Sequence, residues 1–170
     1  MAAEALRVLG VDTSLRSTGV GVVESRGGRL TAVEFGRIPF PASLPHSACL
    51  AGIYDAVGAL VRKTAPAAAA IEGVFFSRNL KTTLILGEAR GAVIAACAGA
   101  GIPVYEYPSR SVKQALAGFG GAEKEQVRRM VMALLGLDRE PQEDEGDALA
   151  LAVCHLHRRK GHPALAPESM

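Results

Sequence analysis

The pattern of apolar and polar positions in the first forty residues predicts three antiparallel strands. Residues 7–12, 18–24 and 29–37 form short β-rich runs at hairpin-like separations, and Gly27-Gly28 supplies the turn between the second and third. Three prolines then interrupt the pattern, at Pro39, Pro41 and Pro45. The early part of the chain therefore reads as a three-stranded meander.

Helical spacing takes over from Ser47, where apolar residues recur at intervals of three and four up to Val61. Further strands are expected at 67–72 and 103–107. Further helices are expected at 80–98, 110–117 (capped by Ser109), 122–135, and from Pro141 to about His157. A meander followed by alternating helices and strands predicts an α/β fold: a mixed sheet, with antiparallel and parallel strands, flanked by helices.

The length of 170 residues fits one domain, which we place at 1–160, followed by a frayed tail at 161–170. Apolar residues make up 49% of the chain and charged residues 21%, which is a globular composition. With 19 Lys and Arg against 17 Asp and Glu, the chain has no overall basicity. A nucleic-acid partner must therefore be argued from where the charges lie.

The cysteines and the apolar runs point to a soluble cytoplasmic protein with no membrane segment. Cys49, Cys97 and Cys154 are an odd number and form no CxxC pair, which argues against disulfides and a zinc site. The most apolar run, 91–104, is shorter than the roughly 20 residues that a membrane span needs. His155 lies too far along its helix from Asp147 to share an ion with it, so a structural role is expected.

Four carboxylates are the leading candidates for chemistry. Asp12 and Glu72 each end an apolar strand, and Asp144 and Asp147 share a face of the last predicted helix. If the four converge, divalent cations such as Mg²⁺ or Mn²⁺ would relieve their repulsion and could support phosphodiester hydrolysis. A purely structural role for these carboxylates stays open. Acidic residues at 140–147 also complement the dipole at a helix start, and Asp12 could be a turn residue.

Four segments together resemble the RuvC family of Holliday-junction resolvases: LRVLGVDTSLRSTGVGVVE, IEGVFFSRNLKTTLILGEARG, VKQALAGFGGAEKEQVRRMV and EDEGDALALAVCH. The resemblance implies a ribonuclease-H-like fold and a homodimer that resolves four-way DNA junctions in recombination and repair. It implies paired symmetric nicks with 5′-phosphate and 3′-hydroxyl ends, and two Mg²⁺ ions per site, with Mn²⁺ as an alternative. The implied catalytic metal ligands are Asp12, Glu72, Asp144 and Asp147. The branch-migration proteins RuvA and RuvB are the implied partners.

The resemblance also extends to DNA contacts. Lys113 and Lys124 match family positions that contact the DNA backbone near the cut, and Phe75 matches a residue that resembles a stacking wedge at the opened junction. Arg78 and Arg128 add local positive charge for phosphate contacts. Taken alone, each of these side chains could equally be a solvated surface cation or, for Phe75, part of the core.

The chain departs from the family at Thr13-Ser14, where the family usually has Pro-Gly. A similar loop occurs in sugar kinases and actin-like ATPases, but these need a second homologous domain for which 170 residues leave no room. Two other functions stay open: a junction-binding module without catalysis, and a ribonuclease-H-like nuclease for another substrate such as an RNA–DNA hybrid.

Overall fold

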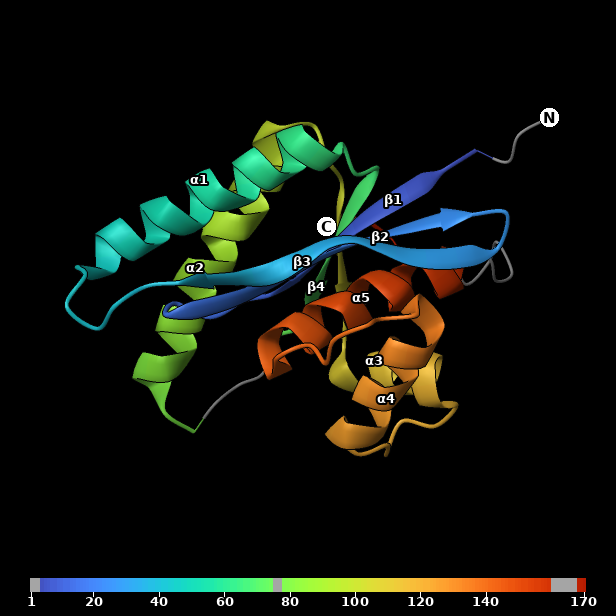
Figure 1. Ribbon diagram of the computed structural model, residues 1–170. Helices are drawn as coiled ribbons and strands as arrows, with labels where there is room; N and C mark the ends of the chain where they lie inside the picture. Colours follow the sequence, from blue (N-terminus) through green and yellow to red (C-terminus); the bar gives the residue numbers. More distant parts are fainter. Residues whose placement is uncertain (1–3, 75–77, 160–167) are drawn as a thin grey trace.

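One mixed sheet forms the centre of the computed structural model, which describes residues 4–74, 78–159 and 168–170 (Figure 1). Its strands are β1 (Leu6–Asp12), β2 (Ser17–Arg26), β3 (Arg29–Pro39), β4 (Ala68–Glu72) and β5 (Val104–Tyr107). They lie in the order β3-β2-β1-β4-β5. β1 to β3 pair antiparallel, whereas β4 is parallel to β1 and β5 is parallel to β4. The predicted meander followed by parallel strands is confirmed.

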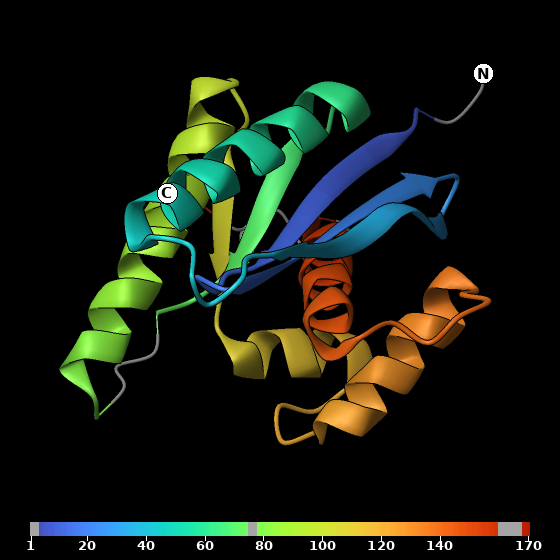
Figure 2. The same cartoon turned by 60° about the vertical axis from the view of Figure 1, so that its left-hand side comes forward.

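Helices cover both faces of the sheet (Figure 2). On one face lie α1 (His46–Thr64) and α2 (Leu80–Gly99), and their apolar side chains pack with those of β1, β2 and β4. On the other face lie α3 (Ser109–Ala117), α4 (Lys124–Leu135) and α5 (Glu143–Arg159). The sheet therefore separates two apolar layers, as expected for a mixed sheet flanked by helices.

Three predicted helix starts are wrong. α4 begins at Lys124 rather than at Ala122. Ser109 does not cap α3, because Pro108 occupies the capping position and Ser109 is the first helical residue. α5 begins at Glu143 rather than at Pro141. The reason is local: the Glu145 carboxylate accepts a hydrogen bond from the backbone N–H of Gln142, so the chain enters the helix only after Gln142.

Glycines in β1 and β2 let α5 lie directly on the backbone of the sheet. A methyl group added at Gly10 would lie 1.8 Å from the carbonyl oxygen of Ala148, and one at Gly19 would lie 2.0 Å from that of Asp144. Since real Cβ atoms essentially never approach within 3.0 Å, neither position has room for a side chain. The absence of these side chains brings the first turn of α5 next to the end of β1.

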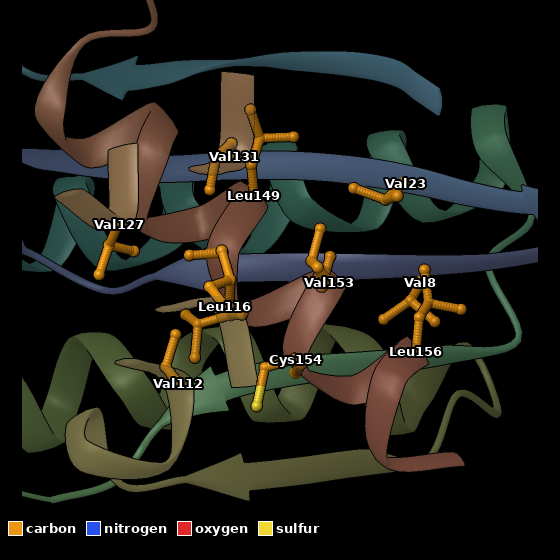
Figure 3. Packing of buried hydrophobic residues seen from close by; sticks show 14 of the residues in the cluster. Val8, Val23, Val112, Leu116, Val127, Val131, Leu149, Val153, Cys154 and Leu156 are labelled. Atoms are coloured by element: carbon orange, nitrogen blue, oxygen red, sulfur yellow. The ribbon is translucent and has the colours of Figure 1, made fainter. Parts of the chain in front are cut away.

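Side chains of α5 form the middle of the larger apolar cluster. Leu149 and Val153 pack in the same cluster as Val8 of β1 and Val23 of β2, with α4 contributing Val131 (Figure 3). All five side chains are fully buried. Burial of a side chain of this kind stabilises the fold by about 1.5–3 kcal/mol, so α5 is firmly fixed on the sheet.

Buried polar groups have the structural roles expected of them. The Nδ1 atom of His155 lies 2.7 Å from the Tyr107 hydroxyl, and burial lowers the pKa of this histidine to about 4. It is therefore neutral at physiological pH. The three cysteines, Cys49, Cys97 and Cys154, are buried free thiols.

α2 leaves much of its apolar surface uncovered. Leu80 and Leu84, four residues apart, are 74% and 61% exposed, and Leu86 is also exposed. By length and composition alone, α2 is a helix that could cross a membrane, the one such helix in the described part of the chain. One side of α2 packs against α1 and contributes to the apolar core. The exposed leucines lie on its uncovered side.

The last described residue lies at the edge of the sheet. The backbone N–H of Met170 donates a hydrogen bond to the carbonyl oxygen of Val104 in the edge strand β5 (2.9 Å). Most of the tail that the sequence predicts to be frayed falls at 160–167, outside the described residues.

Candidate active site

Two carboxylates lie side by side at one edge of the sheet because their strands are parallel neighbours. Asp12 is the last residue of β1 and Glu72 the last of β4, and the preceding residues, Val11 and Ile71, are in register. The carboxyl ends of parallel strands meet at the same edge of a sheet, which is where ligands bind in α/β folds. Asp12 and Glu72 are therefore placed as the sequence predicts.

The first turn of α5 brings two more carboxylates to this edge. Gly19 of β2 lies opposite Asp12 in the strand pairing, and the backbone of Asp144 rests directly on Gly19. The Ser17 hydroxyl donates a hydrogen bond to Oδ2 of Asp144 (2.5 Å). Asp147, one turn further along, faces the strand ends. Close approach of the helix to the sheet thus joins residues more than 130 positions apart.

A cavity of about 130 Å³ lies between the strand ends and the helices. Three of the predicted carboxylates line it, namely Asp12, Glu72 and Asp147. So do two predicted DNA-contacting lysines, Lys113 of α3 and Lys124 of α4. Asp144 does not line this cavity, but its charge acts on both Asp12 and Asp147. Five of the nine predicted site residues therefore share one pocket, and Asp144 is close enough for its charge to act on two of them.

The carboxylates in the pocket bind protons more tightly than free carboxylates do. Burial, followed by the charges of Asp147, Glu72 and Asp144, raises the pKa of Asp12 to about 7. Burial is also the largest cause that raises the pKa of Glu72 and of Asp147. Such shifts in a pocket are typical of a functional site, because the ionised forms need a cation that the protein alone does not fully supply.

Lysine side chains supply part of that positive charge. Lys124 Nζ forms an ion pair with Glu143 and lies 3.8 Å from Oδ2 of Asp147. The hydrogen bond to Glu143, and the charges of Asp147 and Asp12, raise the pKa of Lys124. Lys113 lowers the pKa of both Glu72 and Asp147. Two cations thus face a pocket in which three acids would otherwise repel one another.

The donor set fits a hard divalent cation. Magnesium is usually held by one or two carboxylates, with water and substrate phosphates completing its octahedral shell. Within the described residues, no three Asp, Glu, His or Cys side chains are gathered closely enough to hold an ion by themselves. A cavity of about 130 Å³ has room for water beside an ion, so its three lining carboxylates match a partly hydrated ion better than a fully protein-ligated one.

The pocket continues on both sides into further hollows. On one side, Lys124 and Asp147 also line a hollow between α4 and α5 that Arg128 borders. On the other side, Asp12 and Glu72 line a hollow towards α2, together with residues that include Thr13 and Arg90. These hollows share their lining residues with the central cavity, so the carboxylates lie midway along one groove.

The remaining predicted DNA contacts differ in their placement. Arg128 is beside the groove, and its guanidinium forms ion pairs with Glu125 and with Glu140 (2.8 Å to the latter). Arg78 is exposed in the bend before α2 and, as far as the described residues go, outside the groove lining. Phe75 lies outside the described residues.

The site also contains two serines that the sequence analysis does not predict as site residues. Ser109 lines the cavity, and its side chain hydrogen-bonds Glu72 and lowers the pKa of that carboxyl. The strand pairing could have indicated Ser109. Glu72 is in register with Tyr107 of β5, so the residues just after β5 lie beside Glu72. Ser17, the partner of Asp144, carries no comparable signal, because its role depends on where α5 lies.

Comparison with known proteins settles the family. The family model for the crossover junction endodeoxyribonuclease RuvC matches residues 8–155. The chain belongs to the RuvC family. Its relatives include the RuvC protein of Chloroflexus aggregans, 44% identical over 153 residues that cover 89% of this chain and 93% of the relative. The RuvC protein of Pelobacter propionicus is 47% identical over 152 residues that cover 89% and 86%, respectively. The predicted crossover junction endodeoxyribonuclease is confirmed at the level of the family.

Solved structures agree with this assignment. Thermus thermophilus RuvC in complex with a Holliday junction substrate superimposes with a TM-score of 0.90 at 32% identity, over 97% of this chain and 99% of that one. The yeast mitochondrial Holliday junction resolvase Ydc2 gives a TM-score of 0.63 at 12% identity, over 89% of this chain and 79% of that one, which shows a shared fold. The ribonuclease-H-like fold of RuvC proteins, predicted from the sequence, is thereby confirmed.

Proposed function

We propose that this chain resolves four-way DNA junctions by hydrolysing phosphodiester bonds with divalent metal ions. The observation that carries the proposal is the pocket at the carboxyl edge of the sheet, where Asp12, Glu72 and Asp147 face Lys113 and Lys124. Membership of the RuvC nuclease family supports the same conclusion and implies dependence on a divalent metal. Two Mg²⁺ ions per site are the proposed cofactor, with Mn²⁺ as a substitute.

Each side chain has a distinct task in this proposal. When bound, the ions supply an activated water and stabilise the leaving oxygen of an in-line displacement. Asp12 would be a ligand of the ions, because β1 lies between β4, which ends at Glu72, and β2, whose Gly19 meets the start of α5. Glu72 and Asp147, which also line the cavity, would be ligands that help to position the attacking water, and Asp144 would complete the site. Lys113 and Lys124 neutralise charge on the reacting phosphate. The products carry 5′-phosphate and 3′-hydroxyl ends.

In this proposal the DNA strand that is cut lies along the groove. Its central part is acidic, where ions would lie, while Lys113, Lys124 and Arg128 flank it. Contacts from such side chains go to phosphates and make binding salt-dependent without reading sequence. Phe75 is proposed, by family resemblance, to stack at the opened junction. Arg78 is proposed to add local positive charge for phosphate contacts.

A second copy of the chain is the proposed partner of α2. A four-way junction has two strands to cut, and a two-fold dimer presents two identical sites to them. The exposed leucines of α2, Leu80 and Leu84, supply an apolar stripe on one side of the helix. Burying that stripe against its symmetry mate would remove the largest exposed apolar side chains of α2 from water. RuvA and RuvB, the branch-migration proteins, are proposed as further partners, in the cytoplasm.

The test compares substrates of identical sequence under identical metal conditions. The protein is incubated with a synthetic four-way junction, the corresponding linear duplex and an RNA–DNA hybrid, each with Mg²⁺, with Mn²⁺ and with a chelator. The proposal predicts symmetric paired nicks in the junction alone, and none with chelator. Faster cleavage of the hybrid would show a ribonuclease-H-type activity instead. Binding of the junction without nicks under any metal condition would show a non-catalytic module.

A further inference from the structure

An ion pair behind the pocket fixes the first turn of α5. The Glu145 side chain is 8% exposed, and Arg139 holds it with two parallel hydrogen bonds, Nη1 to Oε2 at 2.8 Å and Nη2 to Oε1 at 3.1 Å. This forked geometry is the strongest form of a carboxylate ion pair, since both oxygens are held at once. Neither residue lines the groove that contains the carboxylate pocket.

The same carboxylate fixes the point at which the chain enters the helix. Oε2 of Glu145 also accepts a hydrogen bond from the backbone N–H of Gln142 (2.9 Å), the residue directly before α5. A glutamate in the third helical position that accepts from the capping residue forms half of a capping box. Asp144 is the neighbour of Glu145 in this turn, and Asp147 lies two residues beyond it. A shift of the turn would therefore move both.

Arg139 ties this turn to an edge strand on the same face of the sheet. Its guanidinium carbon lies 4.2 Å from the centroid of the Phe35 ring, which belongs to the edge strand β3. Stacking of this kind attracts the cation to the ring face and fixes the plane of the guanidinium. The start of α5 is thus held at two points: to β3 through Arg139, and to β2 through the Ser17 hydroxyl on Asp144.

The crowding of negative charge explains why the first turn of α5 needs to be held in place by Arg139. Glu143, Asp144, Glu145 and Asp147 crowd the first five residues of α5. Two hydrogen bonds from Arg139 and one from the Gln142 backbone give the Glu145 carboxylate its own partners within this crowded turn.

We propose that Arg139 and Glu145 are positioning residues, which set the placement of Asp144 and Asp147 relative to Asp12 and Glu72 and thereby the affinity for divalent ions. This inference rests on the proposed metal-dependent function. Residues that orient metal ligands from behind commonly change metal affinity by about 10- to 100-fold when they are replaced. The expected effect is therefore on the metal requirement, and much less on junction binding.

The test uses Glu145→Gln, Arg139→Met and Arg139→Lys, with Glu34→Gln as a matched control. Glu34 pairs with Lys63 on the surface (2.7 Å), so its variant removes an ion pair that touches no part of the site. Two quantities are measured: the dissociation constant for Mn²⁺, from the spin resonance signal of the free ion, and the Mg²⁺ concentration that gives half-maximal junction cleavage. Melting temperatures and junction affinity without metal are recorded for every protein.

We expect Glu145→Gln and Arg139→Met to weaken Mn²⁺ binding and to raise the half-maximal Mg²⁺ concentration by about tenfold or more. Cleavage at saturating Mg²⁺ should return to within about threefold of the unaltered protein, and Arg139→Lys should lie in between. Unchanged metal constants in folded Arg139→Lys and Glu145→Gln proteins, whatever their melting temperatures, would overturn the inference. Absence of cleavage by the unaltered protein would instead overturn the proposed function.

Discussion

Replacement of Gly19 by alanine tests whether close approach of α5 to the sheet creates the site. Gly19 lies opposite Asp12 in the strand pairing, and its Cα faces the backbone of Asp144. The added methyl carbon would lie 2.0 Å from the Asp144 carbonyl oxygen, whereas real contacts essentially never fall below 3.0 Å. The first turn of α5 must therefore move away from β2 by about 1 Å, unless β2 itself shifts.

A displacement of this size has separable effects on stability and on activity. Overpacking of one methyl group typically lowers the free energy of unfolding by about 1–3 kcal/mol, which corresponds to about 2–4 °C of melting temperature per kcal/mol in a chain of this size. A misplacement of about 1 Å among catalytic groups can lower the rate by about 100-fold. We expect Gly19→Ala to fold, to melt several degrees lower, and to cut a junction about 100-fold more slowly.

Single-turnover cleavage of a synthetic four-way junction at saturating Mg²⁺ measures the effect. Gly36→Ala is the matched control, because Gly36 lies in the neighbouring strand β3 and a methyl group there meets nothing within 4 Å. The control should cut and melt like the unaltered protein. A Gly19→Ala protein that melts lower and yet cuts within threefold of the control would refute the argument that the approach of α5 sets the site.

Three further predictions concern charge, protons and assembly. Lys113→Met and Lys124→Met should each lower the single-turnover rate by about 100-fold and reduce the salt dependence of junction binding by about one counterion; a rate within threefold of the unaltered protein would contradict this. Because the pKa of Asp12 is raised to about 7, a proton competes with metal below that pH. The half-maximal Mg²⁺ concentration, titrated at pH 6, 7 and 8, should rise by up to about tenfold from pH 7 to pH 6 and change less from 7 to 8, and a flat dependence would count against an ionised Asp12 as ligand. Leu84→Glu should make the protein monomeric by light scattering and abolish paired nicking, whereas Val33→Glu, an exposed position on β3, should not; a dimeric Leu84→Glu protein would exclude α2 as the interface.

The fold was largely predictable because its periodicities are strong and local. The alternation in β1 to β3 and the two-glycine turn at Gly27 and Gly28 specify the meander, and both glycines have the positive φ angles that such a turn needs. The errors arose at helix starts, where one hydrogen bond decides the boundary. At α5 that bond runs from Gln142 to Glu145, a contact that spacing alone does not reveal.

The candidate site was predictable in part. Asp12 and Glu72 follow from the rule that parallel strands present their carboxyl ends at one edge. The approach of α5 does not follow from periodicity, because it depends on the glycines of β1 and β2 having no side chain where the helix lies. Helical spacing put Asp144 and Asp147 on one face of the last helix, and the family resemblance joined them to Asp12 and Glu72 in one site. Ser17 and the Arg139–Glu145 pair could not be found without the placement of α5, whereas Ser109 follows from the register of β4 and β5.

Near-neutral overall charge is explained by the arrangement of the groove. Acids gather where Asp12, Glu72 and Asp147 meet, and cations such as Lys113 and Lys124 border them. The two sets nearly cancel in the sum of 19 against 17. Local placement, rather than net charge, therefore carries the information about a nucleic-acid partner.

The central claim is that the pocket carboxylates carry out junction cleavage with bound metal, and Asp12→Asn tests it most directly. This change keeps the shape of the side chain and removes its negative charge. That charge lies among those of Glu72, Asp144 and Asp147. Asp55→Asn, on an exposed part of α1, is the matched control. Cleavage and metal-free binding of a four-way junction are measured side by side. We predict that Asp12→Asn binds the junction with unchanged affinity and cuts it at least about 1,000-fold more slowly, while Asp55→Asn behaves like the unaltered protein. Cleavage by Asp12→Asn within tenfold of the control would contradict the account.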